Sequence, residues 1–219
     1  MARVIVRAVA LPGTPLLVPG VAGCSTVLVE SRAQVLDALG EFVRDARRVV
    51  VVDCGAPRAG DRRGEMRPGL EAAGVDPRWW GWAPRTAAPG LPVAGVPASV
   101  ALLALDAAGW EGPVEVVELG STTVPEAGVG IVRDVLAEPG AGLVVVTGAG
   151  SSSPDGAARP AVAGAVGSGV GTVEGAVLAA LGEAGDRDAR QATGEYEERP
   201  YEVVRFRVPA QGRVATVPR

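Results

Sequence analysis

The sequence contains no histidine, no lysine and no asparagine, and these absences exclude several kinds of chemistry at once. All 21 of its positively charged residues are arginines. Without lysine, the chain has no Schiff-base nucleophile and no P-loop lysine for binding nucleotide phosphates. Without histidine, it lacks a common metal ligand and the side chain that most often transfers protons near neutral pH.

Cysteine is also scarce, since the chain has only Cys24 and Cys54 among its 219 residues. Two thiols in a chain of this length are neither a disulfide framework nor a zinc site by spacing. We expect both to be reduced, packed thiols in a cytoplasmic protein. The dominance of Ala, Gly, Val, Pro and Arg is typical of a GC-rich bacterial coding sequence.

The chain has little net charge, −4 at pH 7, and no long apolar run. A surface for nucleic acid or for an anionic membrane needs clustered positive charge, so neither partner is expected. Arg3 and Arg7 interrupt the N-terminal apolar stretch, which excludes a signal-peptide core. The apolar stretch at 93–105 contains Pro97 and is too short to cross a bilayer.

What the sequence does contain is a regular alternation of strands and helices, with no break in composition. We therefore predict a single α/β domain over residues 1–219, with a mostly parallel central sheet between two layers of helices. Strands are predicted at 4–10, 49–52, 114–117, 143–146 and 201–208, the last being a late or edge strand. Helices are predicted at 31–48, 98–109, 126–136 and from Thr172 onward, the first with Ser31 as N-cap in a capping box with Gln34.

Residues 56–92 interrupt this alternation with an irregular excursion rich in Arg, Gly and Pro. The excursion contains Trp79, Trp80 and Trp82, which supply a large apolar area with polar handles. Three interpretations stay open for them: a loop folded over one end of the sheet, an aromatic wall over a cleft, or an interface. We expect a homo-oligomer or a protein partner to use this segment.

Several stretches resemble one family, in the same order along the chain. They are 8–19, a strand running into a proline-rich turn; 91–110, a buried helix leading to a strand; 144–151, a strand followed by a Gly- and Ser-containing turn; and 200–203, a closing strand. In these motifs the chain resembles the class III extradiol ring-cleavage dioxygenase superfamily, of the LigB-like type. The resemblance implies an extradiol dioxygenase-like fold and the position of a cleft.

The same resemblance implies an Fe(II) site made of two histidines and a glutamate. This chain departs from that pattern, because Gly13 or Thr14 stands where the first histidine ligand belongs. Ala149 replaces the aspartate of the motif at 144–151, and no histidine stands elsewhere in the chain to replace the missing ligand. We therefore expect no metal, no cofactor and no active dioxygenase.

The predicted strand ends carry small and polar residues, and parallel α/β sheets bind ligands beyond the carboxyl ends of their strands. One interpretation is a shared pocket for a small anionic ligand; the other is that turns simply favour Gly, Ser and Thr. The candidate binding residues are Thr14, Ser121, Thr122, Gly148, Gly150, Ser151, Ser152 and Arg159.

Asp53, Cys54 and Glu174 are weak catalytic candidates near the same strand ends. Cys54 lacks a histidine base, and the neighbouring Asp53 is expected to raise the pKa of its thiol. The sequence thus favours a non-catalytic binding or assembly protein that has lost the iron site. The alternative is a metal-independent transferase or hydrolase that acts on a small anionic compound through a carboxylate base.

Overall fold

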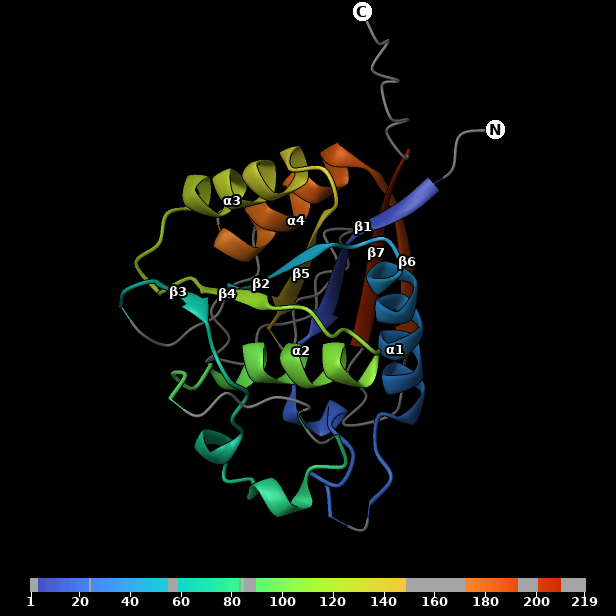
Figure 1. Ribbon diagram of the computed structural model, residues 1–219, viewed down its shortest axis with the longest axis vertical. Coiled ribbons are helices and arrows are strands. Elements are labelled where there is room, and N and C mark those ends of the chain that lie inside the picture. The colour runs from blue at the N-terminus through green and yellow to red at the C-terminus, as the bar shows by residue number, and fades with distance from the viewer. Residues whose placement is uncertain are drawn as a thin grey trace, which may run out of the picture.

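The computed structural model describes residues 4–23, 25–54, 59–82, 84, 90–148, 172–192 and 201–209. These residues form a single α/β unit around one seven-stranded mixed sheet, in the order β3-β4-β2-β5-β1-β7-β6 (Figure 1). The strands are β1 (Val4–Pro12), β2 (Arg48–Asp53), β3 (Arg62–Glu65), β4 (Val114–Glu118), β5 (Ala141–Thr147), β6 (Asp186–Ala192) and β7 (Tyr201–Pro209). The α-helices are α1 (Val29–Val43), α2 (Val96–Ala107), α3 (Pro125–Ala137) and α4 (Val173–Ala184), and short 3-10 helices lie at 15–17, 71–73 and 77–79.

The four central strands, β4, β2, β5 and β1, run parallel to one another. Their residues are almost all apolar and buried, as expected for strands covered on both faces, and the four predicted strands are confirmed. The outer pairings, β3 with β4, β7 with β1 and β6 with β7, are antiparallel. The sheet is therefore parallel only in its centre. β7 is late in the chain, as predicted, but it lies inside the sheet because β6 covers its outer side.

The sequence analysis missed β3 and β6, which are the two outermost strands. Both are made of charged and small residues, RRGE and DRDARQA, and neither shows the apolar alternation of a half-buried strand. Charged side chains are common on edge strands, which have one side open to solvent. Ion pairs hold these strands instead, such as Arg63 with Glu115 on β4 and Arg207 with Asp188 on β6.

The helices occupy the predicted places, and Thr172 caps α4 by accepting the Gly175 N–H at 3.1 Å. The predicted bounds of the first helix are wrong at both ends: Ser31, the predicted N-cap of a capping box with Gln34, lies inside α1, and α1 ends at Val43, while Arg48 already belongs to β2. α1 begins at Val29, and the preceding Leu28 adopts the left-handed conformation at φ 52°. Leu28 is buried in the core, and burial of this side chain favours the earlier start.

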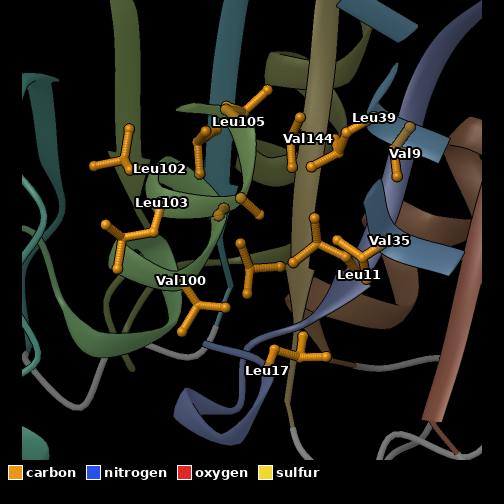
Figure 2. Close-up of a cluster of buried hydrophobic side chains, with 14 of the residues drawn as sticks. Val9, Leu11, Leu17, Val35, Leu39, Val100, Leu102, Leu103, Leu105 and Val144 are labelled. Atoms are coloured by element: carbon orange, nitrogen blue, oxygen red, sulfur yellow. The ribbon is translucent and has the colours of Figure 1, made fainter. Parts of the chain in front are cut away.

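Helices α1 and α2 cover one face of the sheet, and α3 and α4 cover the other (Figure 1). Figure 2 shows how the first face packs. Val9, Leu11 and Val144 of the sheet meet Val35 and Leu39 of α1, together with α2. Helix α2 is buried over almost its whole circumference, as its uniformly apolar sequence predicts. This burial fixes the N-terminus of α2 against the carboxyl ends of the central strands.

Candidate functional site

The carboxyl ends of β4, β2, β5 and β1 lie along one edge of the sheet, which we call the strand-end edge. β1 leads to α1 and β2 leads, through β3, to α2, both on one face; β4 leads to α3 and β5 to α4, both on the other. Every neighbouring pair of these strands therefore sends the chain to opposite faces. Such divergence opens crevices in which α/β proteins bind ligands. The strand-end edge is thus the candidate site.

Two buried acids form the centre of this edge. Asp53 and Glu118 are direct neighbours on β2 and β4, with 1% and 0% of their surface exposed. The Gly95 N–H, immediately before α2, donates a hydrogen bond to the Glu118 carboxylate. Arg62 Nη1 lies 3.5 Å from the other Glu118 oxygen and supplies a countercharge. Sequence reasoning missed Glu118, although an acid that ends an apolar strand, as Asp53 also does, is a usable signal.

Both carboxylates lie against Gly95. A Cβ at this position would lie 3.1 Å from Glu118 Oε1 and 3.6 Å from Asp53 Oδ2. Glycine therefore lets the backbone at the start of α2 approach the acids closely. The N-terminal end of a helix carries partial positive charge, which stabilises nearby anions. The arrangement stabilises negative charge at this point of the edge.

Cys54 follows Asp53 and packs against the core cluster on the α3 and α4 face. Burial raises the pKa of its thiol strongly, and the negative charges of Glu174 and Asp53 raise it further. A thiol in this environment stays protonated at neutral pH and is a poor nucleophile. The three catalytic candidates thus lie near one another, in an arrangement that suppresses thiolate formation.

Glu174, in the first turn of α4, accepts the Gly148 N–H at 3.2 Å. Gly148 is the first residue of the predicted anion-binding loop. Gly150, Ser151, Ser152 and Arg159 lie outside the described residues, so the anion site stays a prediction. The Glu174 carboxylate therefore already accepts a hydrogen bond from the first backbone N–H of that loop, at Gly148.

The predicted hydroxyl residues do not gather at one point. Thr14 is nearly buried after β1, and its side chain accepts the Leu16 N–H at 3.4 Å, which caps a 3-10 helix. Ser121 and Thr122 are exposed beyond β4, and the Thr122 hydroxyl donates to the Ala59 carbonyl on the β3 side. β1 and β4 are the outer strands of the parallel block, about 14 Å apart at three strand spacings. Thr14 and Thr122 thus follow the two strands that lie farthest apart in the parallel block.

The three tryptophans divide into one exposed and two half-buried side chains. Trp79 is 58% exposed, and the Arg78 guanidinium lies 5.2 Å from its ring centroid. Trp80 and Trp82 pack against the core cluster. The Gly81 N–H donates to the Pro19 carbonyl at 2.7 Å and ties the segment to the loop after β1. The loop interpretation from the sequence fits Trp80 and Trp82, and only Trp79 offers its ring to a partner.

A separate shallow hollow of about 320 Å³ lies at the other end of the central strands, where β2 and β4 begin. It is lined by Arg48, Val49, Gly64, Glu65, Pro113 and Glu115. Glu115 bonds to both Arg63 and Arg48, and the hydrogen bond from Arg63 is the largest cause that lowers the pKa of this carboxyl. Arg48 and Glu115 pair with each other here, so the hollow is a weaker candidate than the strand-end edge.

Within the described ranges, no group of three His, Cys, Asp or Glu side chains is arranged to hold a metal ion. In that same part of the chain, none of the helices combines the length and apolar character needed to cross a membrane.

The fold and the strand-end edge define an α/β protein whose central strands are parallel. No protein-family profile matches the sequence, and no curated protein is significantly similar to it. Among solved structures, the chain is similar to uncharacterized protein JW3007 from Escherichia coli K12. The two share 12% sequence identity with a TM-score of 0.50, over 92% of this chain and 99% of that one. At this identity the likeness shows a shared fold and nothing about activity.

Proposed function

We propose that this chain is an extradiol dioxygenase-like (LigB-like) protein that has lost the iron site and serves as a binding or assembly protein. The motif order at 8–19, 91–110, 144–151 and 200–203 is the basis for the family. The parallel centre of the sheet and its strand-end edge are compatible with it. We also propose that the protein is bacterial and cytoplasmic. The cytoplasm is proposed because the two thiols do not make a disulfide framework. A bacterial source is proposed because the composition has a GC-rich coding bias.

The observation that carries the proposal is the packing around Gly13, which with Thr14 is one of the two positions where the resemblance puts the first histidine ligand. A Cβ at Gly13 would lie 2.6 Å from both Pro97 Cβ and Val146 Cγ1, closer than real side-chain carbons approach. Pro97 at the start of α2 and Val146 of β5 thus occupy the space that a side chain at Gly13 would need. The next residue, Thr14, uses its hydroxyl to cap a 3-10 helix.

The other donors at the strand-end edge do not replace the missing ligands. The resemblance implies two imidazole nitrogens and one carboxylate for Fe(II), and the chain has no imidazole. Glu118 is engaged by Gly95 and Arg62, and Glu174 by Gly148. The residues present therefore do not fit an iron centre.

A ring-cleavage assay tests this proposal. The purified chain is loaded with Fe(II) without oxygen, mixed with catechol and protocatechuate, and exposed to air while the absorbance of ring-fission products is followed. We expect no product above the rate of Fe(II) alone, while an active extradiol dioxygenase in the same buffer forms product. Turnover that depends on the protein would overturn the proposal.

The neighbouring acids Asp53 and Glu118 favour one alternative, a metal-independent enzyme. In this alternative, one of the two buried carboxylates acts as the base toward a small anionic compound at the strand-end edge. A screen against phosphate and carboxylate esters distinguishes the two functions, with Asp53→Asn as the matched variant. Hydrolysis by the native chain that disappears in Asp53→Asn would support the enzyme; no hydrolysis by either supports the binding protein.

A further inference from the structure

β6 is the outermost strand on one side of the sheet, beside β7 (Figure 1). All seven of its residues pair with β7 in one unbroken antiparallel register, from Asp186 with Arg207 to Ala192 with Tyr201. It contains no proline and no glycine. Within the described part of the chain, no strand pairs with its outer side. Such an edge presents a row of backbone donors and acceptors that can extend the sheet.

The charges along β6 specify a partner for this edge. If a second copy of β6 pairs antiparallel with Ala189 opposite Ala189, then Asp188 of each copy lies opposite Arg190 of the other. Opposite charges in directly facing positions stabilise a strand pair, and like charges destabilise it. Centring the pair on Asp188 brings two aspartates together, and centring it on Arg190 brings two arginines together. Among these three registers, only the one centred on Ala189 has no facing like charges.

The side chains that would meet across this edge are already held in place. Arg190 Nη1 lies 3.2 Å from Asp37 Oδ2 of α1, and Arg207 Nη1 donates to Asp188 Oδ2 at 2.8 Å. Behind them, Arg205 of β7 is 3% exposed and lies among the carboxylates of Asp37, Glu41 and Asp188. The Arg190 side chain remains 51% exposed and that of Asp188 35%. The edge is therefore preorganised and still reachable, which lowers the entropy cost of association.

β3 forms the other outer side of the sheet, away from β6, and is less suited to pairing with a second chain. β3 has four residues, and its Gly64 has φ 141°, a conformation that L side chains rarely adopt. A short, irregular edge strand is one of the ways in which proteins prevent sheet extension.

We propose that two copies of this chain associate through β6, in an antiparallel pair centred on Ala189, to form a two-fold symmetric dimer with a continuous sheet. A symmetric interface of this kind is the commonest in soluble homo-oligomers. The inference deepens the assembly role proposed above, but it depends on β6 alone. A positive ring-cleavage assay would refute the loss of iron chemistry but would not affect the dimer proposal. A monomeric chain would refute the dimer proposal but would not affect the loss of iron chemistry.

Cysteine cross-linking of the full chain tests the register. In a background with Cys24→Ser and Cys54→Ala, the two copies of Ala189→Cys face each other at about 5 Å between Cα atoms, within disulfide range. Mild oxidation should therefore yield a covalent dimer. Gln191→Cys is the matched control, because its two copies are about 13 Å apart along the strands, beyond disulfide reach. Equal cross-linking of both variants, or of neither, would overturn the proposed register.

Sedimentation over a wide range of concentrations tests the association itself. The native chain should reversibly form dimers, and Arg190→Glu should weaken dimerisation at least about tenfold, because two attractive pairs become repulsive. Arg187→Glu makes the same charge change one position from Asp188, but Arg187 faces the neutral Gln191, so it should weaken dimerisation less than about threefold. Thermal unfolding checks that both variants fold. A chain that stays monomeric, or an equal loss in both variants, contradicts the proposal.

Discussion

Asp53 and Glu118 face each other on adjacent parallel strands, and both are almost completely buried at the start of α2. The Glu118 carboxylate binds the Gly95 N–H and lies beside Arg62, so it joins β4, β3 and α2 at one point. A carboxylate that satisfies a helix N-terminus within its own chain is a structural group first. The chain thus uses Glu118 at the end of β4 to hold its own backbone.

Replacing Glu118 by alanine should therefore destabilise the fold. Loss of a hydrogen bond to a charged group costs about 2 kcal/mol, and the half-buried Gly95 N–H would be left without this acceptor. Chemical denaturation measures the change. Glu65→Ala is the matched control, since Glu65 is exposed on β3 and its loss should stay within about 0.5 kcal/mol. Equal stability of the two variants would contradict the structural role assigned to the Glu118 carboxylate.

The raised pKa of Cys54 predicts how stability depends on pH in alkaline solution. In the unfolded chain a thiol ionises near pH 8.5, whereas the folded state keeps the Cys54 proton to higher pH. The folded state then binds more protons, so stability should fall as pH rises above about 8.5. Denaturation between neutral and alkaline pH, in a Cys24→Ser background, measures this slope.

Cys54→Ala in the same background should show a smaller alkaline loss of stability, because the ionising group is gone. Native Cys54 should also react slowly with a disulfide reagent, and unfolding in denaturant should make it react quickly. Rapid labelling of the native protein would mean that the thiol ionises readily, contrary to its environment.

The contact between Glu174 and Gly148 predicts how anions would bind to the Gly148 loop. A phosphate ion at this backbone donor has to displace the Glu174 carboxylate or lie beside its negative charge. Glu174→Gln should therefore bind phosphate at least about fivefold more tightly than the native chain, as measured by calorimetry, because removing one like charge is worth about 1 kcal/mol or more. Glu183→Gln, an exposed change later on α4, is the control. If none of the three proteins binds phosphate or sulfate, the predicted anion site is wrong.

The tryptophan segment should respond unequally to substitution. Trp82 packs against the core, so Trp82→Ala should cost about 2 kcal/mol of stability. Trp79 is mostly exposed, and Trp79→Ala should cost less than about 1 kcal/mol. Thermal and chemical unfolding measure both. A comparable loss for the two variants would show that Trp79 is part of the core and unavailable to a partner.

The sequence predicted the centre of the fold because its signals there are local and strong. The valine runs at 49–52 and 144–146 are too apolar for anything except buried strands, and Thr172 is a standard N-cap. β3 and β6 could not be predicted in this way. Their charged residues become strands through partners distant in sequence, such as Glu115 for Arg63 and Arg207 for Asp188.

The candidate site was predicted only in part for a related reason. Parallel strands bring Asp53 to the same edge as the other strand ends, and this position follows from the order of elements. Glu118 was missed because its importance depends on Gly95, whose approach to the acids is decided by the packing of α2. The wide spacing of Thr14 and Thr122 depends on strand order, and the alternation of strands and helices does not determine that order.

The metal content of the purified chain tests the central claim, that the strand-end edge has lost its iron chemistry, most directly. The protein is expressed in iron-supplemented medium, purified without chelator and analysed for transition metals by mass spectrometry, with protein concentration from amino-acid analysis. Because the chain has no histidine and Gly13 has no room for a side chain, Fe, Zn, Mn and Cu should each be far below one atom per chain. One iron atom per chain, retained through gel filtration, would contradict the account.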